Sequence, residues 1–214
     1  MKRTNKGRRF QPETLTPEEV QRLLASFSHG PEGVRNRALI AVLYRTGLRI
    51  NEALTLYPKD LDLERGAIRV LNGKGGKSRM VGVDPGAIAM VKAWLDVRIT
   101  LGLNGTHSVF CMRHGQPIRT EYIRVMLPRF ARRAGIEKRV HAHGLRHTHA
   151  AELRAEGMDI GLISKQLGHS SIATTARYLD HIAPWAVVEA VAMRQWRVCA
   201  SPRKSPNSRT TEPV

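Results

Sequence analysis

The 214-residue sequence predicts a mostly α-helical domain with a small antiparallel β-sheet, an α+β fold. Helix caps and apolar residues at helical spacing recur over most of the chain. Only one segment, near the middle, changes to the pattern of strand, glycine-rich turn and strand. Hydrophobic residues make up 42% of the chain, which is enough to build the core of one domain.

The first part of the chain contains clear helix start and stop signals. Thr16 and Glu19 form a capping box around Pro17, which suits the first helical position and predicts a helix to about Ser26. Pro31 opens a second helix, and a glycine is well placed to end it. These signals predict helices over about 17–26, 31–46 and 49–57.

The middle of the chain predicts a basic hairpin. Apolar residues alternate with others over 67–71 and again over 78–83, and the segment between them is rich in glycine and lysine. Beyond the hairpin, proline caps and glycine stops divide the chain into further helices. We expect these helices over 85–98, 120–134, 144–156, 160–167, 171–179 and 184–197.

This pattern predicts one main domain with short appendages. The expected parts are a flexible basic arm over 1–15, the domain over 16–182, an amphipathic helix over 183–198 and a disordered tail over 199–214. The sequence shows no internal repeat and no linker between two large domains.

The charge of the chain indicates the class of its partner. Thirty-five Lys and Arg residues against 18 Asp and Glu give a formal charge of +17, which usually serves a polyanion, most commonly nucleic acid. Solubility or an acidic membrane surface would also explain such a charge. No apolar run is long enough to cross a bilayer, and Cys111 and Cys199 form no CxxC pair. We therefore expect a soluble, non-exported protein of the reducing cytoplasm.

Two basic residues stand at positions where an anion could bind. Arg49 follows a helix stop and begins the next helix, where its guanidinium could grip phosphate oxygens together with backbone N–H groups. Lys74 lies in the turn of the hairpin, where its ammonium could enter a groove. Each residue alone is also compatible with an ordinary solvated side chain.

The segment from His141 to His149 is more specific, because it holds four histidines and one arginine. Helical spacing places His143, Arg146 and His147 on one face. The spacing of His143 and His147 fits a zinc site, but no third ligand is evident nearby. An anion site, with Arg146 as the clamp and His143 as a hydrogen-bond donor or proton shuttle, suits the basic chain better.

Two further residues complete the set of chemically active side chains. His169 follows the helix stop at Gly168, and Tyr178 lies late in the next helix. A tyrosine in a helix is usually half-buried packing, but cationic donors and a nearby base make its hydroxyl a nucleophile.

Taken together, five motifs in this order resemble the catalytic domain of the tyrosine recombinases, of the lambda-integrase, Xer and Cre type. The motifs are TGLRINEAL (46–54), GKGGKSR (73–79), HGLRHTHA (143–150), LGHSS (167–171) and TTARY (174–178). The resemblance implies that Tyr178 is the nucleophile and that the other catalytic residues are Arg49, Lys74, His143, Arg146 and His169. It also implies that Glu52 orients the pocket, and it favours Lys74 over Lys77 as the hairpin lysine.

The same resemblance implies a site-specific DNA recombinase of the integrase or invertase type that acts on double-stranded DNA. Tyr178 would form a 3′-phosphotyrosine link, with Lys74 as general acid and His143 as the acceptor of the tyrosine proton, and no metal or other cofactor is implied. A type IB topoisomerase-like relaxing activity is an alternative within this chemistry. A histidine–metal hydrolase or a plain basic DNA-binding module is the alternative from another class.

Most relatives carry a core-binding domain ahead of this one, whereas about fifteen residues precede the first capped helix here. We therefore expect a short recombinase whose diffuse positive charge partly replaces that domain. The amphipathic helix over 183–198 would either pack on its own domain or dock on a neighbour, giving a tetramer on two DNA sites. Accessory DNA-binding proteins and a nucleoid-associated location in the cytoplasm complete the expectation.

Overall fold

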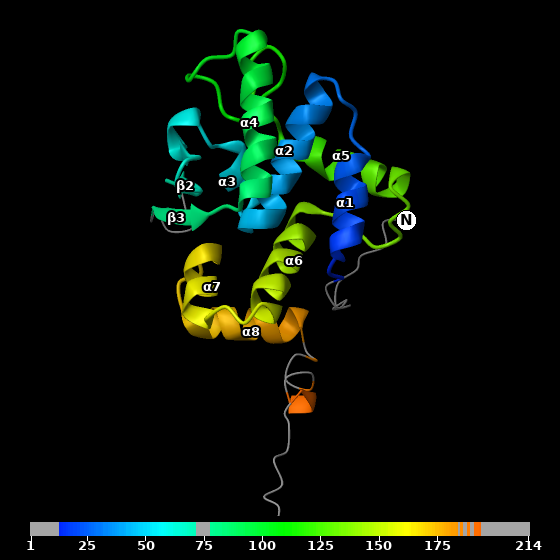
Figure 1. Ribbon diagram of the computed structural model, residues 1–214, viewed down its shortest axis with the longest axis vertical. Helices are drawn as coiled ribbons and strands as arrows, with labels where there is room; N and C mark the ends of the chain where they lie inside the picture. Colours follow the sequence, from blue (N-terminus) through cyan, green and yellow to red (C-terminus); the bar gives the residue numbers. More distant parts are fainter. Residues whose placement is uncertain (1–12, 72–77, 184, 186–187, 189–190, 194–214) are drawn as a thin grey trace, which may run out of the picture. The chain divides into compact units, whose positions relative to one another are not determined.

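The predicted α+β fold is confirmed by a computed structural model that describes residues 13–71, 78–183, 185, 188 and 191–193 (Figure 1). Within these residues the chain forms eight α-helices and one three-stranded sheet. The helices are α1 (Pro17–Ala25), α2 (Pro31–Thr46), α3 (Ile50–Leu54), α4 (Pro85–Thr100), α5 (Thr120–Arg133), α6 (Ala142–Ala155), α7 (Ile160–Leu167) and α8 (Ile172–Ile182). The strands are β1 (Leu61–Asp62), β2 (Ala67–Val70) and β3 (Arg79–Gly82), and a short 3₁₀ turn (Pro58–Asp60) precedes them.

The helix boundaries follow the cap signals closely. The side chain of Thr16 accepts from the Glu19 backbone N–H, and the Glu19 carboxylate accepts from the Thr16 N–H, as the capping box predicts. Gly47 ends α2 in the left-handed conformation at φ 63°. The third helix is shorter than predicted, because the chain leaves α3 after Leu54 and enters the 3₁₀ turn at Pro58.

The core is built around α2. All residues from Ala38 to Tyr44 are buried, so this helix is covered on every side, as expected for a central helix. It packs against α4 and α6 (Figure 1). The end of α2 and the start of α3, where Arg49 lies, are thereby held on a rigid support.

The predicted hairpin is confirmed as β2 and β3, paired antiparallel with Ala67 opposite Gly82 and Val70 opposite Arg79. Strand β1, which adds to β2, was not predicted because two residues give no alternating pattern. On its other side, β3 is joined to α7 by the amide of Gln166. This amide accepts from the Gly82 N–H at 3.0 Å and donates to the Gly82 carbonyl at 2.9 Å.

A smaller hydrophobic cluster joins α6, α7 and α8, which lie together in the lower part of the domain in Figure 1. It consists of Ala150, Leu153, Ile163, Leu167, Leu179 and Ile182. This cluster fixes α8, the helix that carries Tyr178, against α6, the helix that carries Arg146.

Several predictions fall outside the described residues. These concern most of the arm (1–12), the hairpin turn with Lys74 and Lys77, most of the helix over 184–197, and the tail with Cys199. The chain divides into two compact units, 1–184 and 185–214. Cys111 is buried and free. In the described ranges, no helix is long and apolar enough to cross a membrane.

Candidate active site

Arg146 is the centre of the candidate site. It lies in the first turns of α6, whose start is capped by His141 through a 2.9 Å bond from the Gly144 N–H to the imidazole Nδ1. The residue is only 2% exposed. Its guanidinium donates to the Gly47 carbonyl at the end of α2 and, at 2.6 Å, to the Leu167 carbonyl at the end of α7. A buried cation is thus stabilised by two helix C-termini, where partial negative charge collects.

His169 is held between Arg146 and α8. Its Nε2 lies 3.2 Å from Nη2 of Arg146, and its Nδ1 lies 2.9 Å from Oγ1 of the buried Thr175. Because arginine can only donate, Nε2 is the acceptor, and Nδ1 therefore carries the proton and donates to Thr175. Thr175 was not among the predicted site residues.

Tyr178 lies one helical turn after Thr175 and packs among three imidazoles. Its ring stacks on His147 at a centroid distance of 5.1 Å and meets His169 edge-on at 5.2 Å, and the His143 ring lies 6.4 Å away. Its hydroxyl is buried without a hydrogen-bond partner in the described part of the chain. Burial raises the pKa of Tyr178 to about 12, against the lowering effect of the Arg146 and Arg49 charges. The hydroxyl is therefore protonated at neutral pH.

The three imidazoles beside Tyr178 are neutral at pH 7. Burial, followed by the charge of Arg146, lowers the pKa of His143, and it lowers the pKa of His169 to about 4. Burial and the neighbouring His143 lower the pKa of His147 to about 4. Neutral imidazoles beside a protonated phenol can accept a proton, and they leave the arginines as the source of positive charge.

Arg49 caps α3 and shares one carboxylate with a second arginine. Its Nη1 lies 3.0 Å from Oε1 of the buried Glu52, and its backbone N–H donates to Oε2 at 2.9 Å. Arg79 of β3 binds the same carboxylate through both Nη atoms, at 3.0 and 2.9 Å. The orienting role expected for Glu52 stays a prediction, but its contacts reach two arginines rather than one.

The structure therefore brings most of the predicted site residues into one cluster. The members of the cluster are Arg49, His143, Arg146, His169 and Tyr178, whereas Lys74 lies outside the described residues. Sequence reasoning did not assign a role to Arg79 or Thr175, and it placed His147 only on the Arg146 face of the helix. Over the described ranges, no three His, Cys, Asp or Glu residues are grouped so that they could hold a metal ion.

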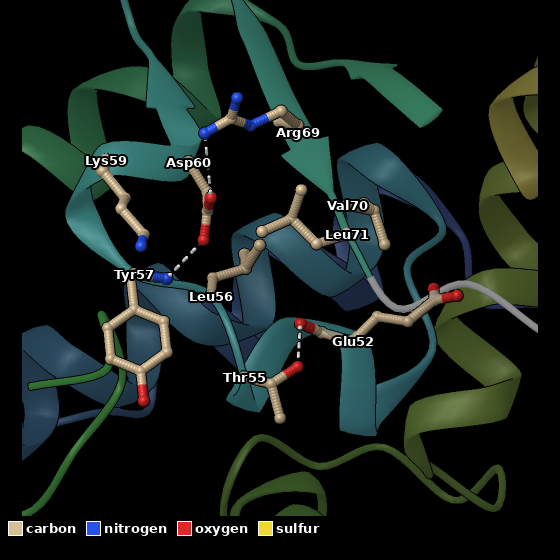
Figure 2. Close-up of a pocket in the computed structure, with 9 residues that line it drawn as sticks. All are labelled: Glu52, Thr55, Leu56, Tyr57, Lys59, Asp60, Arg69, Val70 and Leu71. Carbon is tan, nitrogen blue, oxygen red and sulfur yellow. Dashed lines mark hydrogen bonds and ion pairs between the residues drawn. The ribbon is translucent and has the colours of Figure 1, made fainter. Parts of the chain in front are cut away.

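A cavity of about 140 Å³ lies beside Glu52, between α3 and β2 (Figure 2). Apolar side chains of Leu56, Val70 and Leu71 line it. Asp60 accepts from the Tyr57 N–H at 2.9 Å and forms an ion pair with Arg69 at 3.6 Å. Apart from Glu52, no residue of the candidate site lines this cavity.

Comparison with known proteins identifies the class to which this fold and cluster belong. Residues 13–183 match the model of the phage integrase family, so the chain belongs to that family. The tyrosine recombinase XerC of Xanthomonas campestris pv. campestris (strain B100) is 39% identical over 176 residues, which cover 82% of this chain and 53% of the relative. The tyrosine recombinase XerD of Halalkalibacterium halodurans is 36% identical over 170 residues, 78% of this chain and 56% of the relative.

Solved structures agree with this assignment. The XerA recombinase superposes with a TM-score of 0.76 at 31% identity, over 89% of this chain and 68% of that one. The XerH site-specific recombinase bound to its palindromic difH substrate superposes with a TM-score of 0.70 at 32% identity, over 86% of this chain and 54% of that one. The catalytic domain of bacteriophage HP1 integrase superposes with a TM-score of 0.56 at 26% identity, over 84% of this chain and 94% of that one. The chain thus spans about half the length of the curated relatives but nearly all of an isolated catalytic domain.

Proposed function

We propose that the protein is a site-specific DNA recombinase that cleaves and rejoins double-stranded DNA through a 3′-phosphotyrosine intermediate. One observation carries this proposal: the Tyr178 ring packs against His147 and His169 of the same chain, beside the buried guanidinium of Arg146. Membership of the phage integrase family supports it.

In the proposed reaction, the Tyr178 oxygen attacks a backbone phosphorus while the bond to the 5′ oxygen breaks. The phosphoryl group is then ester-linked to tyrosine, and attack by a 5′-hydroxyl reverses the step and rejoins the strand. The tyrosine proton passes to a neutral imidazole, for which we propose His143. Lys74 supplies the proton of the 5′-hydroxyl that leaves. The reaction consumes no metal ion or nucleotide.

The arginines stabilise the charge that develops on the non-bridging oxygens. Three N–H groups of Arg146 are bound to Gly47, Leu167 and His169, so two of its five lack a partner among the described residues. We propose that these two groups bind the phosphate when it enters beside Tyr178, together with Arg49, whose side chain is about one-third exposed. Preorganised donors of this kind typically contribute about 10²–10³ each in rate.

The wider charge of the chain would hold the DNA. Helix α5 buries Ile123, Met126 and Leu127 on one face. Its arginines at 124, 129, 132 and 133 are exposed and can reach phosphates. We propose that these residues and the basic arm bind the duplex without reading its sequence, because contacts to phosphates carry no base information.

We further propose that the active form is a tetramer on two DNA sites, joined through the helix predicted over 183–198. Accessory DNA-binding proteins would assist it, and the protein would act in the cytoplasm on the nucleoid. Truncation after Ala183 tests the assembly. It should abolish cooperative binding to paired half-sites, and unchanged cooperativity would argue against assembly through this helix.

The central experiment is a cleavage assay on suicide substrates built from inverted repeats that flank the gene. The wild-type protein should form a covalent protein–DNA adduct, and Tyr178→Phe should form none while binding DNA as before. Tyr57→Phe is the matched control, because Tyr57 is exposed and lies outside the cluster. An adduct that persists in Tyr178→Phe removes this residue from the nucleophile role.

The same protein preparation tests the alternative relaxing activity. Because Tyr178 packs in the pocket of its own chain, a single protomer could cut and reseal one strand without a neighbour. Relaxation of supercoiled plasmid without recombinant products would indicate a type IB topoisomerase-like enzyme, whereas exchange between two sites would indicate a recombinase.

A further inference from the structure

Two arginines bind one buried carboxylate at the edge of the candidate site. Glu52 Oε1 accepts from both Arg49 and Arg79 at 3.0 Å, and Oε2 accepts from Arg79 and from the Arg49 backbone at 2.9 Å. Burial raises the pKa of the Glu52 carboxyl, but the hydrogen bonds from Arg79 and Arg49 outweigh it, and the pKa lies below its usual value. At neutral pH the three side chains therefore carry a net charge of +1.

The two arginines differ in their exposure to a ligand. The Arg79 side chain is only 14% exposed, whereas that of Arg49 is 35% exposed. The backbone at Gly168, in the left-handed conformation at φ 65°, closes over Arg79. A Cβ atom at this glycine would lie 2.6 Å from Nε and 2.7 Å from Cζ of Arg79. A phosphate can therefore reach Arg49 more easily than Arg79.

The geometry of the pairs also favours Arg79 as the partner of the carboxylate. Arg79 binds Glu52 through two parallel N–H···O bonds, the stronger and more rigid arrangement for an arginine–carboxylate pair. The Arg49 side chain makes a single such bond. Glu52 thus holds the Arg49 guanidinium by a single hydrogen bond, while the guanidinium of Arg79 binds both carboxylate oxygens and balances most of the Glu52 charge.

We propose that Arg79 is a positioning residue that balances the charge of Glu52, so that Arg49 keeps its positive charge for the scissile phosphate. This inference rests on the proposed function, because it assumes that a phosphate binds at Arg49. Without Arg79, Glu52 and Arg49 would form a neutral pair, and the phosphate would have to compete with the carboxylate for the Arg49 guanidinium.

The test is a charge-balance rescue, measured as the single-turnover rate of adduct formation on the suicide substrate. Arg79→Met removes the charge but keeps much of the length of the side chain, and we expect a loss of about 100-fold, the effect of one preorganised donor. Adding Glu52→Gln to this variant removes the carboxylate but keeps an acceptor oxygen for Arg49. The double variant should recover at least about tenfold over Arg79→Met.

The control and the folding check use the same substrate. Arg65→Met removes one exposed arginine in the turn between β1 and β2, and this variant should cleave within about threefold of wild type. Thermal denaturation of each variant measures its folding. If Arg79→Met does not fold, Arg79→Lys takes its place, because lysine keeps the positive charge but cannot form the bidentate pair with Glu52. This variant should retain at least about one-tenth of the wild-type rate.

The outcomes separate this inference from the proposed function. A wild-type protein that forms no adduct overturns both. If the wild type forms the adduct but the double variant is as slow as Arg79→Met, only the charge-balancing role is overturned. The same holds if the wild type forms the adduct and a folded Arg79→Lys variant is about 100-fold slower than wild type. A purely structural role of Arg79 predicts no rescue, because the Glu52→Gln substitution cannot restore the packing that the arginine side chain provides.

Discussion

The protonation of His149 should make the stability of the domain depend on pH. This residue lies in α6 and is only 4% exposed, and among the described residues neither ring nitrogen has a hydrogen-bond partner. Its ring packs under the end of α2, where a Cβ atom at Gly47 would lie 2.8 Å from it. Burial, and then the charges of Arg45 and Arg146, lower the pKa of His149 to about 4.

The sign and size of the effect follow from linkage. The imidazole of an unfolded chain has a pKa near 6.5, so the unfolded state binds a proton first as the pH falls. The free energy of unfolding is therefore not reduced by His149 above pH 6.5, and it decreases as the pH falls from 6.5 toward 4. The difference between 6.5 and about 4 corresponds to about 3 kcal/mol in total, of which about 2 kcal/mol is lost between pH 7 and pH 5.

His149→Phe tests this reasoning, because it keeps a flat ring and removes both nitrogens. The loss of unfolding free energy between pH 7 and pH 5, measured by urea denaturation, should be about 2 kcal/mol smaller than in the wild type. At pH 7 the variant should be about as stable as the wild type, since an unpartnered polar group is replaced by an apolar one. His29→Phe, at an exposed position, is the matched control. An unchanged pH dependence in His149→Phe would refute the buried, neutral state of this histidine.

Three further predictions concern the site and its DNA. Thr175→Val removes the acceptor of the His169 Nδ1–H and should slow adduct formation by about tenfold; an unchanged rate contradicts the assigned tautomer. Gly168→Ala should lower the unfolding free energy by at least about 1 kcal/mol more than Gly135→Ala, because both have positive φ but only Gly168 contacts Arg79; equal losses would exclude that contact. If about six phosphates are neutralised, the logarithm of the DNA association constant should decrease linearly with the logarithm of the salt concentration, with a slope near −5. An affinity that does not depend on salt would contradict electrostatic binding.

The fold was predictable where local signals suffice. Thr16, Pro31 and Gly47 set helix ends through hydrogen bonds and backbone angles that depend on near neighbours. The burial of α2 on every side was not predictable, because it depends on what α4 and α6 place around it. Strand β1 was not predictable for a similar reason, because its two residues are defined by their pairing with β2 and have no alternating pattern of their own.

The candidate site was predictable where its residues share a helix or follow a helix stop. His143 and Arg146 are linked by helical spacing, and His169 by the glycine before it. Arg79 and Thr175 carry no such signal, because their partners, Glu52 and His169, come from other elements. The alternating pattern of the hairpin indicates which strand holds Arg79, but only the tertiary structure shows that its guanidinium is turned toward α3.

The side chain of Gln166 acts like one residue of a fourth strand. By pairing with both the N–H and the carbonyl of Gly82, it occupies the open edge of β3 at that point, so another chain cannot add a strand there. The same amide contacts the Thr46 carbonyl at 3.3 Å, and the next residue, Leu167, accepts from Arg146. Any displacement of β3 would therefore be transmitted through α7 to the buried arginine, which links the position of the sheet to the alignment of the side chains in the candidate site.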